Sequence, residues 1–79
     1  MARYFVHLTD GHHSLIDPEG REIVDPSLIG TLALKEARAI ISQEALGGRI
    51  DLNQFIEVRD KAGKLVDHLS FRGAVSVID

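Results

Sequence analysis

Apolar residues at the start of the chain recur at every second position, which is the period of a β-strand with two different faces. Between residues 3 and 8, one face carries Tyr4, Val6 and Leu8. Aromatic and β-branched residues are also enriched here, as is typical of strands, so the pattern predicts a first strand over 3–8. The opposite face of this strand carries Arg3, Phe5 and His7.

Turn residues divide the next part of the chain into short segments. Asp10-Gly11 ends the first strand, and residues 14–17 can form a second strand that completes a β-hairpin. The segment Asp17-Pro18-Glu19-Gly20 has proline at its second position and glycine at its fourth, a composition that favours a β-turn. We expect residues 22–24 to pair briefly before a helix begins.

The hydrophobic period changes after residue 25 to that of an amphipathic helix. Asp25 has the side chain of an N-cap, and Pro26 occupies the first helical position, where its missing N–H costs nothing. Gly47-Gly48 is expected to end the helix, with one of the two glycines in the left-handed conformation. The apolar stripe consists of Ile29, Ala33, Ala37, Ile40 and Ile41.

A second β-hairpin is predicted after the helix. Residues 55–60 form its first strand, and residues 60–64 form a turn with glycine at a left-handed position. Residues 64–71 form its second strand. Residues 74–78 are apolar enough to add a terminal strand or to pack along an edge of the sheet.

The register of this second hairpin decides which side chains share a face of the sheet. The turn places Asp60 opposite Lys64 and Val58 opposite Val66. One face then carries Ile56, Val58, Val66 and His68. A single helix covers only one face of a small sheet, so the other face must meet solvent, a second copy or a partner. The residues that we expect to form an interaction surface on that face are Phe5, His7, Phe55, Leu65 and Leu69.

These elements predict an α+β fold of the order ββαββ: a β-hairpin, one amphipathic helix and a second β-hairpin, with the helix on one face of an antiparallel sheet. The chain has 79 residues, 44% hydrophobic and 27% charged, a balance that fits one globular domain over 1–79. The core of so short a chain is marginal, and there is no cysteine to cross-link it. Oligomerisation is therefore the reinforcement that the sequence leaves open.

Charge and hydropathy limit the kinds of partner. The net charge is −3, and no basic stripe is visible of the kind that neutralises phosphates, so we expect no direct contact with nucleic acid. No apolar run approaches the length of a membrane span or a secretory leader. We therefore expect no membrane contact and a cytoplasmic location, where the absence of cysteine suits the reducing conditions.

The order of motifs resembles a family of short bacterial proteins whose defining domain has no assigned function. Its first half is carried by Arg3-Tyr4-Phe5, His7-Leu8, Asp10-Gly11 and Asp17-Pro18-Glu19-Gly20. Its second half is carried by Gly48-Arg49-Ile50-Asp51-Leu52, Ile56-Glu57-Val58-Arg59-Asp60, Gly63 and Phe71. The chain departs from the family at Gly30 and Thr31, where alanine or charged helix formers are usual, and at Asp67, where an aliphatic residue is usual. The resemblance implies a shared fold and carries over no catalytic or binding residue.

Histidine is the residue type that most invites a chemical mechanism. His7, His12 and His13 lie near Asp10 and Asp17, a combination compatible with a metal site or a general base. His12 and His13 are neighbours, however, and their side chains point apart in an extended chain. No serine has the surroundings of an activated nucleophile. The sequence therefore assigns no catalytic, cofactor-binding or metal-binding residue, and we expect neither enzymatic activity nor a cofactor.

Together these observations favour a small non-enzymatic protein-interaction or regulatory module that forms a homodimer or binds a small protein partner. The order of its elements is similar to that of HicB-like antitoxin domains, which are also acidic and dock on a small basic toxin. The alternative is a small metal-binding protein or enzyme that uses the N-terminal histidine and aspartate cluster.

Overall fold

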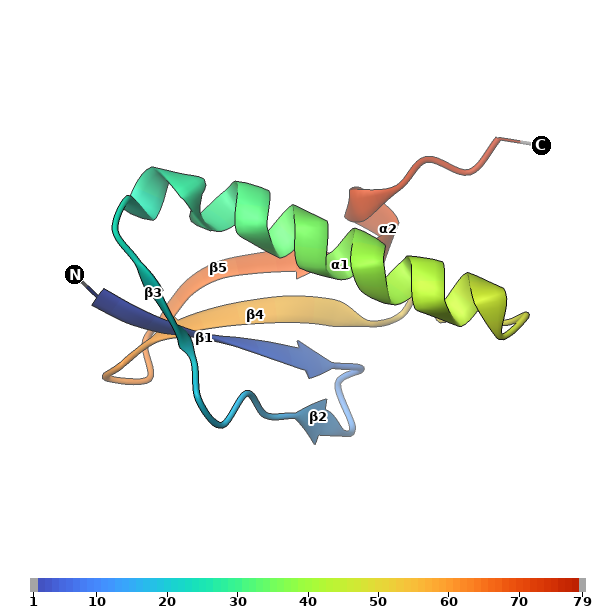
Figure 1. Ribbon diagram of the computed structural model, residues 1–79. Helices are drawn as coiled ribbons and strands as arrows, with labels where there is room; N and C mark the ends of the chain where they lie inside the picture. Colours follow the sequence, from blue (N-terminus) through green and yellow to red (C-terminus); the bar gives the residue numbers. More distant parts are fainter. Residues whose placement is uncertain (1, 79) are drawn as a thin grey trace.

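The computed structural model describes residues 2–78, in which five strands form one antiparallel sheet and a long helix lies across one of its faces (Figure 1). This arrangement confirms the α+β prediction. The strands are β1 (Ala2–Thr9), β2 (Ser14–Leu15), β3 (Arg21–Ile23), β4 (Phe55–Asp60) and β5 (Leu65–Ser70). The helices are the short 3-10 helix η1 (Pro26–Leu28), the helix α1 (Ile29–Leu46) and the single turn α2 (Phe71–Ala74).

Strand β1 lies inside the sheet and has partners along both edges. On one side it pairs with β4 from Tyr4 to Thr9. On the other side it pairs with two short strands: β2 near its end, with Leu8 opposite Leu15, and β3 near its start, with Tyr4 opposite Arg21. That edge of the sheet is therefore divided between β2 and β3, and a loop connects them.

The helix begins where the sequence predicts a cap. The carboxylate of Asp25 accepts hydrogen bonds from the backbone N–H of Ser27 (3.0 Å) and from its hydroxyl (2.8 Å). The capped segment is η1, which continues directly into α1. At the other end Gly48, with φ of 87°, takes the left-handed conformation and stops the helix.

The core lies between α1 and the strands β4 and β5. Ala33 and Ala37 are fully buried and have small side chains, so α1 can pack closely on the sheet. Phe71, Ile56 and Val58 are the largest fully buried side chains. Phe71 comes from α2, which closes the end of the core beside α1.

The structure differs from the prediction at the C-terminal end of the last strand. The sequence predicts a strand over 64–71 and a possible further strand over 74–78, but β5 ends at Ser70. The hydroxyl of Ser70 accepts a hydrogen bond from the N–H of Gly73 (3.1 Å) and caps α2, which turns Phe71 into the core. Residues 75–78 form neither helix nor strand.

The predicted register of the second hairpin is correct at the turn and wrong beyond it. The N–H of Asp60 donates to the carbonyl of Lys64 (3.0 Å), as expected. A β-bulge then places Val58 opposite Asp67, so Val66 is an extra residue in β5. The faces of the following residues are exchanged as a result. His68 lies opposite Glu57, and Leu69 lies opposite Ile56.

Candidate functional site

An apolar groove of about 560 Å³ runs along the side of α1 that faces β1 and β2. It forms because α1 packs on β4 and β5 and leaves the β1 side of the same face uncovered (Figure 1). Ile40 of α1 forms one wall, and the segment from Leu15 to Pro18 forms the other. The apolar residues that line the groove are Val6, Leu8, Leu15, Ile16, Pro18, Ile40 and Ile56.

The rim of this groove exposes large aliphatic side chains. Leu15 is 71% exposed and Ile16 is 61% exposed. A single exposed aliphatic residue is ordinary, but several around one hollow form a contiguous apolar surface, which in monomeric proteins usually marks a binding site. The groove therefore has the character of an interaction site.

A second apolar hollow adjoins the groove at Arg21, which lines both. The guanidinium of Arg21 on β3 forms an ion pair with the carboxylate of Glu36 on α1, with 3.2 Å between Nη1 and Oε1. The pair is half exposed and contributes little to stability. The second hollow is lined by Ile23, Val24, Leu28 and Leu32. We call the groove and this hollow together the apolar flank.

Asp17 fastens one wall of the groove to the edge of β1. Its Oδ2 accepts a hydrogen bond from the N–H of Val6 (3.2 Å), and its Oδ1 accepts from the N–H groups of Glu19 (3.2 Å) and Gly20 (3.0 Å). Burial alone would raise the pKa of the Asp17 carboxyl. The three N–H groups and the charge of Arg21 outweigh that effect and hold its pKa below the usual value. The carboxylate is therefore ionised at neutral pH.

His7 makes the reciprocal contact from β1 to the same loop. Its Nδ1 accepts a hydrogen bond from the backbone N–H of Asp17 (3.0 Å). Gly20 allows the loop to lie this close to β1. Its φ of 70° is a backbone conformation that favours glycine, and a Cβ at this position would lie 2.8 Å from the carbonyl oxygen of Tyr4. Side chain to backbone bonds thus hold the loop against β1 between the two short strands.

The face of the sheet opposite α1 carries most of the predicted interaction surface. Phe5, His7 and Phe55 are half-buried there, and Leu65 is 42% exposed. The prediction is wrong for Leu69, because the bulge turns this side chain toward the core, where it packs. His68 takes a place on the uncovered face instead, with its ring centroid 4.6 Å from that of Phe55.

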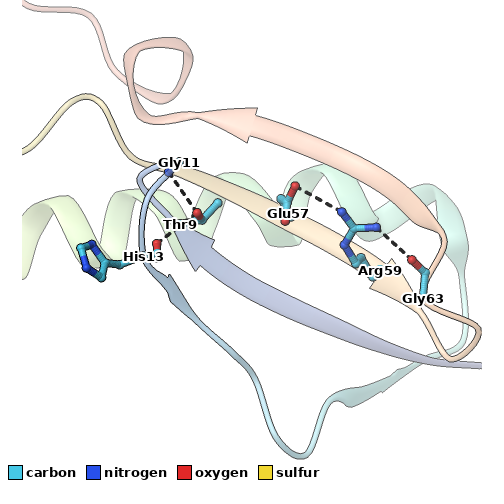
Figure 2. A network of polar contacts seen from close by, with 6 residues as sticks. All are labelled: Thr9, Gly11, His13, Glu57, Arg59 and Gly63. Carbon is cyan, nitrogen blue, oxygen red and sulfur yellow. Dashed lines mark hydrogen bonds and ion pairs between the residues drawn. The ribbon is translucent and has the colours of Figure 1, made fainter.

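Charged side chains separate the aromatic residues of this uncovered face. Arg59 makes two contacts, both drawn in Figure 2: its Nη1 donates to the carbonyl of Gly63 (2.9 Å), and its Nη2 lies 3.4 Å from Oε2 of Glu57. Glu57 itself stands between His7 on β1 and His68 on β5. The uncovered face is therefore a mixed aromatic and charged surface, less apolar than the groove.

The backbone of His12 and His13 and the carboxylate of Asp10 close the turn after β1. The N–H groups of His13 (2.7 Å) and His12 (2.8 Å) donate to Oδ1 of Asp10 and hold the pKa of that carboxyl below its usual range. The hydroxyl of Thr9 donates to the carbonyl of His13 (3.1 Å) and accepts from the N–H of Gly11 (3.1 Å), as Figure 2 shows. Within residues 2–78, no three histidine or acidic side chains gather as metal ligands.

The model of the domain of unknown function DUF6894 matches residues 3–72, which extend from β1 into α2. The chain belongs to the DUF6894 family. The match includes the groove, the Asp17 loop and both faces of the sheet, so these features all lie within the DUF6894 domain. No curated protein and no solved structure matches the chain. None of the helices in the part that the structure describes has the length and apolar character to cross a membrane.

Sequence reasoning missed the groove of this DUF6894 domain. One signal was present: Leu15 and Ile16 are adjacent apolar residues in a polar neighbourhood. A strand turns neighbouring side chains to opposite faces, so both cannot enter one core. The helix α1 packs on β4 and β5, and this choice leaves the β1 side of the sheet open. The sequence of the helix alone does not specify which strands it covers.

Proposed function

We propose that this DUF6894 domain is a non-enzymatic protein-interaction module that binds a second copy of itself through the apolar flank. The observation that supports the proposal is the pair of exposed aliphatic side chains, Leu15 and Ile16, on one wall of the apolar groove. Exposed apolar area on this scale costs free energy in water that association recovers.

The shape of the flank favours a second copy as the occupant. It has both a hollow, floored by Val6 and Leu8, and protruding side chains on the rim, Leu15 and Ile16. A two-fold dimer brings the same surface of each copy together, so such a surface must be self-complementary. Protruding residues of one copy can fill the groove of the other, which meets this requirement.

The charges at the rim give less support to a small basic partner such as the one that HicB-like antitoxins bind. Asp17 and Glu36 carry two negative charges, and Arg21 carries one positive charge and is paired with Glu36. The groove therefore has an excess of only one negative charge, and Glu22 and Asp25 of the second hollow raise the excess on the flank to three. Charges of this kind affect the rate of encounter more than the affinity. Apolar burial is the stronger source of affinity on this surface.

The energy available is enough for a weak dimer. Burial of ~400 Å² of apolar surface gives roughly 10 kcal/mol at ~25 cal/mol per Å² before the costs of association are subtracted. Loss of translational freedom and ordering of side chains remove a large part of this sum. At most ~6 kcal/mol then remains, which corresponds to a dissociation constant of about 40 μM or weaker. We therefore expect weak self-association rather than an obligate dimer.

Sedimentation equilibrium of two matched variants tests the proposal. Leu15→Ser alters the rim of the groove, and Leu65→Ser alters the uncovered face; both leucines are exposed on strands at an edge of the sheet, so neither change should disturb the fold. We expect the wild-type protein to dimerise, Leu15→Ser to weaken the dimer about tenfold, and Leu65→Ser to leave it unchanged.

Other outcomes of this experiment contradict the proposal in different ways. Weakening by Leu65→Ser alone would assign the interface to the uncovered face with Phe5, His7 and Phe55. A wild-type protein that stays monomeric at high micromolar concentration would exclude self-association. A small basic protein that binds this monomer and is lost on Leu15→Ser would assign the groove to a different partner.

A further inference from the structure

The hydrogen bond between His7 and the Asp17 loop depends on the protonation state of the imidazole. Nδ1 of His7 accepts from the backbone N–H of Asp17 at 3.0 Å. A ring nitrogen accepts only when it carries no proton, so the neutral ring must hold its proton on Nε2. In the imidazolium form both ring nitrogens are donors, and two N–H groups would then face one another at this distance.

The segment that this bond holds is a wall of the groove. Ile16, Asp17 and Pro18 all line the groove, and the bonded N–H belongs to the middle residue of the three. The remaining bonds of Asp17 run through its carboxylate to the backbone N–H groups of Val6, Glu19 and Gly20. Loss of the His7 bond would therefore loosen the wall locally and leave the loop attached to β1.

We propose that His7 is a proton-controlled latch on the groove: protonation of its imidazole releases the N–H of Asp17 and frees the Ile16–Pro18 wall to move. Histidine is the side chain type whose protonation ordinarily changes between pH 5 and 8. The regulatory meaning of this latch rests on the proposed function of the groove. The latch itself can be observed in the free protein.

The charged groups around His7 come from three elements. Glu57 of β4 lies directly opposite it, with Arg59 beside Glu57. The carboxylate of Asp17 lies in the loop, and His68 of β5 is on the far side of Glu57. Glu57 attracts an imidazolium ring and keeps it in place on the sheet. The Asp17 carboxylate also attracts the ring and stays bonded to β1, whereas the backbone N–H of Asp17 repels it. Protonation should therefore displace the loop backbone rather than the ring.

Asp17 does not obscure this titration. Its carboxyl pKa is held below the usual value of 3.8, so the carboxylate stays ionised while histidine titrates. Any change at the Asp17 amide between pH 5 and 8 therefore has to come from another group.

Nuclear magnetic resonance of the ¹⁵N- and methyl-labelled full chain, at concentrations where it is monomeric, tests the latch. From pH 8 to pH 5 we expect the Asp17 amide proton to shift upfield with the same midpoint as the ring protons of His7. The methyl signals of Ile16 should move with that midpoint as well. An Asp17 amide that stays unchanged while His7 titrates would overturn the proposal.

Two variants identify the titrating group. His7→Asn places an amide oxygen close to the position of Nδ1 and accepts a hydrogen bond at every pH, so the response of Asp17 between pH 5 and 8 should disappear. His68→Asn removes the other histidine of the same face and should leave the response intact. A response that persists in His7→Asn, or that vanishes in His68→Asn, would contradict the assignment.

The two proposals can fail separately. If the Asp17 amide titrates with His7 but sedimentation shows no dimer, the latch exists and the groove has a different role. If the protein dimerises through the groove and the Asp17 amide is unaffected by pH, the interaction stands without this control.

Discussion

The carboxylate of Asp67 lies beside Gly30 in the first turn of α1, so that a Cβ added at Gly30 would be 3.9 Å from Oδ2 of Asp67. The two residues are far apart in the sequence, and the structure shows that they face each other. The bulge at Val66 turns Asp67 toward the helix. Its negative charge then lies near the positive end of the α1 dipole.

Gly30→Ala should stabilise the protein. The new methyl group would make an ordinary van der Waals contact with Asp67, and alanine removes the flexibility that glycine gives to a helix. We expect the free energy of unfolding in urea to rise by about 0.5–1 kcal/mol. Gly48→Ala is the matched control: φ is 87° there, so the same change should destabilise by about 1 kcal/mol. Equal effects at both sites would refute this reasoning.

Asp25→Ala should lower the midpoint of thermal unfolding by a few degrees. The substitution removes the acceptor for the N–H and hydroxyl of Ser27 and exposes the start of η1 and α1. Asp25→Ser keeps a capping oxygen and should retain most of the stability. The comparison is made by circular dichroism at neutral pH, and an unchanged midpoint for Asp25→Ala would show that the cap is dispensable.

Stability should fall as the pH drops below about 4. The pKa values of Asp10, Asp17 and Asp25 are each held below the ordinary value of 3.8. A carboxyl whose pKa is lower in the folded state stabilises that state fully above its unfolded pKa, and this contribution is lost as the pH falls through the folded pKa. Urea unfolding between pH 2 and 7 measures the effect. Asp17→Asn should flatten the acid part of this profile.

Phe71→Ala should be severely destabilising. Phe71 is fully buried at the end of the core, and its truncation leaves a cavity, at a cost of about 3–5 kcal/mol. Phe55→Ala, on the uncovered face, is the control and should cost clearly less because Phe55 is only half-buried. Comparable losses of unfolding free energy in the two variants would mean that Phe55, on the uncovered face, stabilises the fold as much as the buried Phe71.

The features that the sequence predicted correctly depend on neighbouring residues. The cap at Asp25 and the stop at Gly48 follow from local hydrogen bonding and backbone freedom, which short motifs specify. The buried stripe of α1 follows from its period, although Ile40 lies at the edge of the stripe and lines the groove. The β-turn over Asp17-Pro18-Glu19-Gly20 also follows from local composition.

The features that the sequence did not predict depend on packing between distant segments. If the register at the turn continued unchanged, Val58 would lie opposite Val66. The β-bulge instead places Asp67 beside α1 and Leu69 against the core, and these contacts involve residues distant in the sequence. The sequence pattern places Phe71 at the end of a strand, but in the structure Phe71 begins α2 and is buried in the core. The bond from the Asp17 N–H to His7 has no signature in a sequence, because the two residues meet only when the loop lies against β1.

Both edges of the sheet, among residues 2–78, are poorly suited to polymerisation. One is divided into the short strands β2 and β3, and the other is β5, which carries a bulge and uses the Asp67 carboxylate to bind the N–H of His68 (2.9 Å). A strand from another molecule would find few backbone groups in line to pair with, so growth into fibres is disfavoured. Copies of this chain that meet are therefore expected to do so through side chains rather than by extending the sheet.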